Sequence, residues 1–355
     1  MRLLSRRARV GLGLGGGVCL AVAAVGGLAN PARFFQGYLI GYTFWVGLAL
    51  GCLGLALIHV LTGGRWGLAT RRIFESGAAT LPVLALLFLP ILAGLPSLYP
   101  WTATSDSKSL YLNVPFFGVR AVLYFGVWIG ISRLPRRWSV VGLMALGLTA
   151  SFAAIDWWMS LEPAWFSTMY PPMICIGEVL VAMASAVLLV TLTQKHVAPG
   201  LLNDLGSLLL AFVMLWAYMT FFQYMLIWSG NLKGEITWYV RRTTQGWEPV
   251  AWSVAGVGFV LPFSLLLFRG LKRDPRWLAA IAGLLVCARM LEVYWLIEPA
   301  FAPSGPVLDW MWPLVGLGIG GIWMALFTWR LAAAPIAAAD DAGVLDRAEA
   351  ASAPA

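Results

Sequence analysis

The sequence returns repeatedly to long apolar runs, and this feature restricts its possible folds more than any other. A run of about 18 or more apolar residues forms a helix that can cross the roughly 30 Å hydrocarbon core of a membrane. Hydrophobic residues make up 60% of the chain and charged residues only 11%, which excludes an ordinary soluble domain. The sequence therefore predicts an all-α, multi-pass integral membrane protein.

We predict ten membrane spans from these runs. They cover residues 10–28, 38–61, 78–97, 114–132, 138–159, 167–193, 204–229, 249–268, 276–298 and 307–330. Cytoplasmic loops of membrane proteins are enriched in Lys and Arg. With the N-terminus inside, the outer segments hold few basic residues, namely Arg33, Lys108, Lys233, Arg241 and Arg242. We therefore expect both termini in the cytoplasm, and the net charge of +8 reflects topology rather than nucleic-acid binding.

The first span and the tail raise separate questions. The Arg-rich start and Gly-rich core of the first span also fit a cleaved signal peptide, although Leu28-Ala29-Asn30 is a poor cleavage site. Its removal would leave the orientation of the other spans unchanged, so charge does not decide between the two. The tail after Leu331 is rich in Ala with scattered acids, and we expect it to be disordered.

The cysteines and histidines argue against a metal redox centre in this chain. Cys19, Cys52, Cys175 and Cys287 lie in apolar runs and form no C-x-x-C or C-x-x-C-H motif. This excludes an iron–sulfur cluster or a covalently attached c-type haem held by this chain alone. The two histidines, one of them in a polar loop, do not supply the paired ligands of a membrane cytochrome b.

The stretch 154–170 (AIDWWMSLEPAWFSTMY) contains two acids six residues apart, Asp156 and Glu162. Glu292 and Glu298 repeat this spacing, and in both copies the second acid begins a Glu-Pro-Ala-aromatic sequence. An acid buried at a membrane edge is costly unless it is paired or used in chemistry. The alternative interpretation is an ordinary interfacial loop with an aromatic belt.

The two copies lie 136 residues apart, which maps spans two to five onto spans six to nine. Because four spans separate them, the copies share one orientation and form a parallel repeat. We predict two four-helix bundles with spans one and ten packed outside; chance similarity between apolar sequences is the alternative. The corresponding segments are 1–37, 38–163, 164–299, 300–331 and a disordered cytoplasmic tail, 332–355.

Several blocks together resemble one family. They include LTGGRWG (61–67), DWWMSLEPAWFST (156–168) and IWSGNL (227–232), within a match over about residues 38–330. The chain resembles the second quinone-binding-type (ActF-like) membrane subunit of bacterial alternative complex III, in the NrfD-like, polysulfide-reductase membrane-subunit superfamily. It departs from the family in its tail and at Glu292, where Asp is expected.

The resemblance implies ten transmembrane helices in two bundles, located in the bacterial cytoplasmic membrane. It also implies a quinol:electron-acceptor oxidoreductase of several subunits. A sister NrfD-like membrane subunit would carry the main quinol site. Iron–sulfur and multihaem cytochrome c subunits would lie on the outer face. This chain would hold no cofactor and would not be catalytic alone, and a quinol site shared with the sister subunit stays open.

Four charged residues are expected in the outer half of the membrane, where they could form one polar cluster: Arg120, Asp156, Arg289 and Glu292. Arg289 and Glu292 share a helix face because they are three residues apart. With Glu162 and Glu298 they suit ion pairing. Such a network either locks the bundles together, or it provides a quinone head-group pocket or an exit path for protons from oxidised quinol.

Two further residues are candidates for proton transfer. Glu178 lies near the middle of span six, and a lone glutamate there is a functional hypothesis by default; the alternative is a protonated side chain hydrogen-bonded to a neighbouring helix. His59 lies one turn before Thr62-Gly63-Gly64-Arg65-Trp66 and could collect cytoplasmic protons, since imidazole exchanges protons near neutral pH. Alternatively, it only faces the interface.

The outer loop 230–247 mixes aromatic and basic residues and suits docking to an extramembrane partner, or an amphipathic interfacial segment. We expect a cofactor-free membrane subunit of a quinol-oxidising respiratory complex, contributing to assembly and to proton release or translocation. A secondary transporter is one alternative, because ten spans, a parallel repeat and mid-membrane charges suit it; few spans look broken, which argues against it. A purely structural membrane anchor for outer redox subunits is another.

Overall fold

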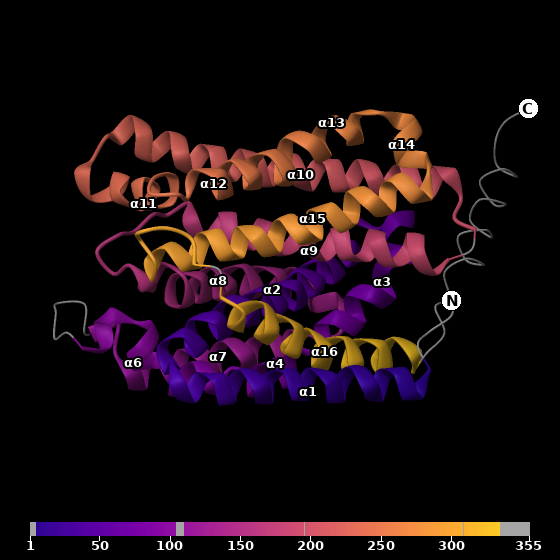
Figure 1. Cartoon of the computed structure of the whole chain (residues 1–355). Helices are drawn as coiled ribbons and strands as arrows, with labels where there is room; N and C mark the ends of the chain where they lie inside the picture. Colours follow the sequence, from indigo (N-terminus) through magenta and orange to yellow (C-terminus); the bar gives the residue numbers. More distant parts are fainter. Residues whose placement is uncertain (1–4, 104–109, 195, 308, 334–355) are drawn as a thin grey trace, which may run out of the picture.

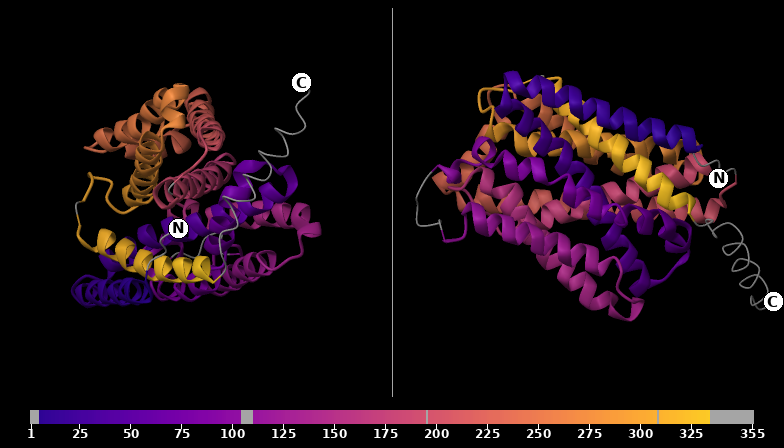
Figure 2. Two further views of the ribbon diagram at one scale, coloured as in Figure 1. Left: turned by 90° about the vertical axis from the view of Figure 1, so that its right-hand side faces the viewer. Right: turned by 90° about the horizontal axis from the view of Figure 1, so that it is seen from below.

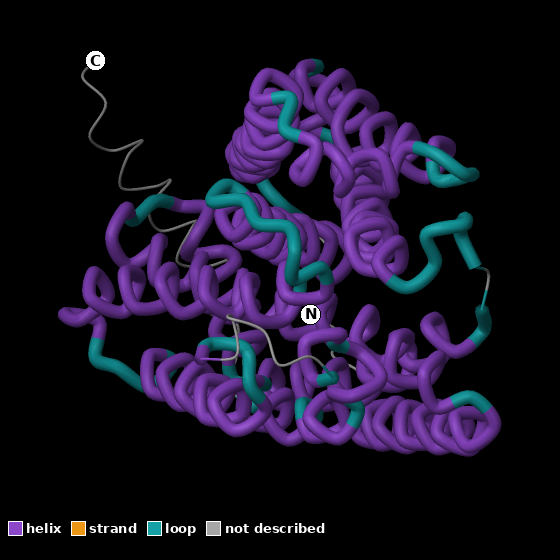
Figure 3. Tube along the Cα trace, turned by 90° about the vertical axis from the view of Figure 1, so that its left-hand side faces the viewer, coloured by secondary structure: helices purple, strands orange, loops and turns teal. Residues whose placement is uncertain are grey.

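The computed structural model describes residues 5–103, 110–194, 196–307 and 309–333. Within these ranges every regular element is a helix (Figure 3). Ten helical segments are long and apolar enough to cross a membrane, which confirms the predicted number and is typical of a multi-pass membrane protein. Lys108 and, apart from its first two residues, the predicted disordered tail lie outside the described ranges.

The first half of the chain builds five of these segments. Its helices are α1 (Arg6–Ala29), α2 (Pro31–Thr62), α3 (Arg65–Ala78), α4 (Leu81–Leu86), α5 (Leu89–Ala93), α6 (Leu95–Leu98), α7 (Val114–Ile131) and α8 (Ser139–Trp157), with short 3-10 turns at Pro100–Thr102, Arg136–Trp138 and Met159–Leu161. Asn30 caps α2 by accepting a hydrogen bond from the backbone N–H of Arg33, and Pro31 fills its first position, where no donor is needed.

The second half builds the other five. Its helices are α9 (Tyr170–Thr193), α10 (Pro199–Gly230), α11 (Lys233–Thr243), α12 (Glu248–Ala255), a π-helical turn at Gly256–Val260, α13 (Leu261–Leu267), α14 (Arg269–Arg273), α15 (Pro275–Ile297), a 3-10 turn at Glu298–Ala300 and α16 (Met311–Ala332). In Figure 1 the long helices run side by side, and the start of α1 and the end of α16 lie at the same end of the molecule.

The third span differs from the prediction in where it starts and in its shape. It begins at Arg65, thirteen residues before the predicted start, immediately after Gly63 and Gly64. These glycines adopt positive φ angles of 67° and 98° and make a tight turn out of α2. A Leu-Pro pair then opens each of α4, α5 and α6, because proline cannot donate the hydrogen bond that would continue the preceding helix. The span is therefore kinked.

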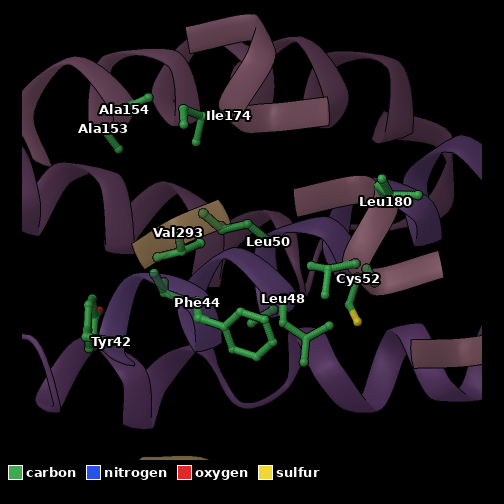
Figure 4. Close-up of a cluster of buried hydrophobic side chains, with 14 of the residues drawn as sticks. Tyr42, Phe44, Leu48, Leu50, Cys52, Ala153, Ala154, Ile174, Leu180 and Val293 are labelled. Carbon is green, nitrogen blue, oxygen red and sulfur yellow. The ribbon is translucent and has the colours of Figure 1, made fainter. Parts of the chain in front are cut away.

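Helix α2 is the centre of the molecule. It packs against α3, α8, α9 and α16. Of the residues in its most apolar 18-residue stretch, 72% are buried, against 17% in the corresponding stretch of α1. Figure 4 shows Phe44 and Leu50 of α2 in one buried cluster with Ala154 of α8, Ile174 of α9 and Val293 of α15. Figure 2 shows α1 at the periphery.

Helix α1 is attached to the rest through glycines. A Cβ atom at Gly16 would come within 3.0 Å of the Gly318 carbonyl oxygen and the Ile322 nitrogen of α16, and one at Gly321 would meet the backbone of α1. Such close backbone contact is typical of helix pairs in membranes. Helix α16 in turn packs on α2.

Candidate functional site: a buried pair of acids that share one arginine

Glu178 lies in the first half of α9, where that helix crosses α2. Its side chain is buried and rests on Gly47, whose hypothetical Cβ would lie 3.0 Å from Glu178 Cγ. The backbone carbonyl of Glu178 lies so close to Gly51 that a Cβ there would overlap it. Two glycines one turn apart on α2 therefore let the α9 backbone approach and place the carboxyl group inside the helix bundle.

Arg289 enters the same region from α15. A side chain at Gly177 would overlap its guanidinium group, so a third glycine provides the space that this group occupies. Arg289 Nη1 donates a hydrogen bond to Glu292 Oε2, one turn further along α15. The indole Nε1 of Trp216 on α10 donates to Glu292 Oε1 over 3.0 Å. Both oxygens of Glu292 are thus satisfied.

Glu178 has no such partner. Its carboxyl group interacts electrostatically with Arg289, but no hydrogen bond to it is formed by the described residues. The two side chains line a small cavity together with Thr43, Trp158 and Val293. Trp158 Nε1 and Arg289 Nε are both buried without a hydrogen-bond partner. Buried polar groups are normally satisfied, so this cavity holds an unusual concentration of free hydrogen-bonding capacity.

The π-helical turn shapes the other side of this site. Gly258 lies in that turn, and a Cβ there would meet the ring of Trp216 at 3.4 Å. The turn and the glycine therefore leave room for the indole that holds Glu292. Single-turn π segments inside helices occur often at functional sites. Neither Trp216 nor Gly258 was identified from the sequence, because each gains its role only through contact between distant helices.

Asp156 belongs to a separate cluster. Arg120 donates to both of its oxygens, from Nε over 2.7 Å and from Nη2 over 3.0 Å, and Tyr124 Oη donates to Asp156 Oδ2 over 2.7 Å. Arg120 Nη1 donates to the Tyr111 carbonyl oxygen, and its guanidinium lies 3.9 Å from the centre of the Tyr111 ring. All three guanidinium nitrogens of Arg120 and both carboxylate oxygens of Asp156 are therefore hydrogen-bonded, which is typical of a structural ion pair.

The expected single polar cluster is therefore two. No ion pair or hydrogen bond between described residues joins Arg120 or Asp156 to Arg289 or Glu292. The first pair links α7 to the end of α8, in the first half of the chain. The second lies on α15 and faces α9 and α10, so the packing of the helices keeps the two apart.

The other two acids of the repeat, Glu162 and Glu298, form ion pairs with residues outside their own segment. Glu162 forms ion pairs with Arg241 and Arg242 of α11 at 2.9 and 2.8 Å. Arg242 is buried and also donates to the Leu296 carbonyl oxygen over 2.8 Å. Burial lowers the pKa of the Arg242 guanidinium, and the Glu162 carboxylate opposes that shift. The predicted outer loop 230–247 therefore contains a helix, α11, which these bonds hold against Glu162 and Leu296.

Glu298, the counterpart of Glu162 in the repeat, is tied to the start of α2. Arg33 Nη1 donates to Glu298 Oε1 over 2.7 Å, and Asp309 lies 3.9 Å from Arg33 Nε. Each of the four residues expected to form ion pairs, Arg120, Arg289, Glu162 and Glu298, therefore has an oppositely charged partner. Among the acids named as candidates from the sequence, Glu178 alone forms no ion pair with a described residue.

His59 lies apart from all four of these groups of charged residues, at the end of α2. Its Nδ1 is 3.3 Å from the Gly63 carbonyl oxygen, and its ring packs edge-on against Trp66. A side chain at Gly67 would overlap the imidazole. The histidine is therefore enclosed by the turn between α2 and α3, and no described acid forms an ion pair with it.

Among the described residues, no group of three or more His, Cys, Asp or Glu side chains is arranged to hold a metal ion. A scan of the chain against protein-family models found no match, and a search of curated proteins found no significant relative. The chemistry that the arrangement can support is therefore argued from its geometry. Two buried carboxyl groups share one guanidinium, and one of the two faces a small cavity without a hydrogen-bond partner.

Proposed function

We propose that this chain is a cofactor-free membrane subunit of a quinol-oxidising respiratory complex of the alternative complex III type, and that Glu178 takes up and releases protons in it. One observation carries the proposal. The Glu178 carboxyl is buried against α2 without a hydrogen-bond partner, while Glu292 takes the hydrogen bond from the one arginine near both. An acid held in this way is suited to exchange a proton with its surroundings.

Charge balance supports this role. One guanidinium neutralises one carboxylate, and a second uncompensated charge inside a membrane protein costs several kcal/mol. The pair Glu178 and Glu292 therefore holds one proton at rest. A change in field or hydration at the cavity would release it, and a proton passes between groups within hydrogen-bond reach or through one bridging water. The cavity offers about 10 Å³ to the centre of a water molecule, roughly the space for one.

The wider assignment rests on the sequence blocks that resemble the family. In such a complex, oxidation of a quinol to a quinone releases two electrons and two protons. The electrons would pass to iron–sulfur and haem groups in partner subunits, and a sister membrane subunit would bind the quinol. This chain would contribute helices at that interface and a route for protons, in the cytoplasmic membrane of a bacterium with both termini inside.

The proposed two-bundle architecture agrees with the helix contacts. In one half α2 packs against α3 and α8, and α7 packs against α4 and α8. In the other half α9 packs against α10 and α15, while α12 contacts α15 and α13 contacts α10. Each set of contacts closes a ring of four spans, which supports the proposed pair of four-helix bundles. The α2–α9 contact that carries Glu178 would then join the two bundles.

A secondary transporter fits this geometry less well. Transporter sites are commonly formed where spanning helices unwind and expose backbone groups to the substrate. The third span is kinked at its prolines, yet Ala79, Thr80, Leu87 and Phe88 keep right-handed helical backbone angles. Its backbone groups therefore stay within the helical hydrogen-bonding pattern, and the cavity at Glu178 is too small for a metabolite.

The assignment is tested by isolating the tagged chain from its native membranes in a mild detergent and recording the visible spectrum. We expect c-type haem bands in fixed ratio to this chain, together with quinol oxidation that a quinone-site inhibitor blocks. A colourless chain that purifies alone after gentle solubilisation would refute the respiratory assignment. The role of Glu178 is tested separately, by the substitution described in the Discussion.

A further inference from the structure

A groove lies between α1 and α16 and is lined by residues near the start of α1 and the end of α16. These two helix ends lie at one end of the molecule (Figure 1). Near Gly16 and Gly321 the two helices are in backbone contact. Between the start of α1 and the end of α16 they leave a space of about 780 Å³. Gly13 and Ala325 form its floor, and Trp329 forms part of its wall. The groove is mostly apolar and, because α1 is the most exposed span, it opens towards the surrounding lipid.

Two arginines line this groove, and a third lies against one of its lining residues. Arg6 and Arg9 line it, one turn apart on α1, and neither forms an ion pair with a described residue. Arg9 Nε is buried without a hydrogen-bond partner. On the opposite helix the guanidinium of Arg330 lies 4.9 Å from the centre of the Trp329 ring. Among the described residues, no acidic side chain lines the groove.

We propose that this groove binds one anionic phospholipid, with its phosphate between Arg6 and Arg9 and an acyl chain along Gly13 and Ala325. A guanidinium pair matches a phosphate in charge and hydrogen-bond geometry. The apolar floor matches the chain that a lipid carries and a free phosphate ion lacks. Basic pockets between spanning helices on the side rich in Lys and Arg recognise such headgroups. The lipid would stabilise the contact between α1 and α16.

The test is native mass spectrometry of the full-length protein, freed of lipid in detergent and titrated with phosphatidylglycerol or with phosphatidylcholine of the same acyl chains. We expect one phosphatidylglycerol to bind about tenfold more tightly than phosphatidylcholine. The variant R6Q/R9Q should lose this preference. The control R133Q/R137Q removes the same charge at the same end, outside the groove, and should keep it. Equal binding of both lipids, or an equal loss in the control, would overturn the proposal.

A second pair of variants tests the apolar part without changing charge. Gly13→Leu fills the floor, where an added Cβ meets only Ala325 at 3.5 Å, and should weaken phosphatidylglycerol binding at least fivefold. Gly11→Leu points into open space and should leave binding unchanged.

Inorganic phosphate should not compete with the lipid. Displacement of the lipid by phosphate at similar concentration would show that the groove is only an anion site. Substituting Asn for Asp340 and Asp341 should change nothing, and a several-fold gain would instead identify the chain's own acidic tail as the occupant.

Discussion

Glu178 on α9 faces Arg289 on α15 without a hydrogen bond between them, while the same guanidinium donates to Glu292. Three glycines make this arrangement possible: Gly47 and Gly51 admit Glu178, and Gly177 admits the guanidinium. The position of the Glu178 carboxyl group therefore depends on how closely the helices pack as well as on its charge. The substitutions below separate its charge from its packing.

Replacing Glu178 by Gln should preserve the fold and lower proton release. Gln keeps the volume of the side chain and removes a buried carboxyl that has no hydrogen-bond partner, so stability should stay equal or rise slightly. If Glu178 carries protons, the ratio of protons released to electrons transferred should fall in membrane vesicles given a quinol. Glu75→Gln, at an exposed acid paired with Arg71, is the control and should leave the ratio unchanged. An unchanged ratio in both variants would favour the purely structural anchor.

The shared arginine makes a specific order of stabilities testable. Arg289→Gln leaves two buried carboxyl groups without a counter-charge, and breaking a buried pair in this way costs about 3–5 kcal/mol. Glu292→Gln leaves Arg289 with Glu178 and keeps an acceptor for Trp216, so it should cost much less. The double variant should lie between them. Thermal unfolding in detergent measures this order; a Glu292→Gln protein less stable than Arg289→Gln would contradict the sharing of the guanidinium.

Asp156 should behave in the opposite way to Glu178. Asp156→Asn leaves the buried Arg120 without a counter-charge, so we expect a loss of about 3–5 kcal/mol in unfolding free energy. Tyr124→Phe removes one hydrogen bond to the same carboxylate and should cost about 1.5–3 kcal/mol. In the protein that still folds, proton release per electron should match the unmodified complex. A selective fall in that ratio with unchanged stability would move the proton route to Asp156.

How far the sequence predicts this molecule follows from what each signal measures. The number of spans follows from hydrophobic length, which acts locally along the chain. The start of α3 cannot be predicted from hydrophobic length, because its first turns, RWGLATRR, are polar. Hydropathy identifies only the apolar middle of a span. The helix begins at Arg65 because Gly63 and Gly64 end α2 there.

The site divides in the same way. Glu178 stands out as a lone acid in an apolar run, and the pair Arg289 and Glu292 follows from helical spacing. Their association does not follow, because it depends on α2, α9, α10 and α15 meeting at one place. Trp216 illustrates the limit: nothing near it in sequence distinguishes it from the other tryptophans, and only its contact with Glu292 gives it a role.

The crossing of α2 and α9 provides the sharpest packing test. Two glycines of α2, Gly51 and Gly54, lie less than one turn apart but face different neighbours. At Gly51 an added Cβ would overlap the Glu178 carbonyl and lie 2.8 Å from Ala182 Cβ, so Gly51→Ala must push the helices apart. Overpacking of this kind costs about 1–3 kcal/mol, and proton release should fall with it because Glu178 is displaced. At Gly54 the nearest atom, Leu146 Cδ2, is 3.7 Å away, which is ordinary contact.

Gly54→Ala should therefore be neutral or stabilising by up to about 1 kcal/mol, since Ala is the better helix former. The comparison is made by melting temperature in size-exclusion chromatography with fluorescence detection, alongside proton release in vesicles. If Gly51→Ala melts at the same temperature as Gly54→Ala and releases protons normally, close contact between α2 and α9 does not position Glu178. A loss confined to Gly51→Ala ties the acid to this crossing, because both variants add one methyl group to the same helix and only one of them meets a backbone.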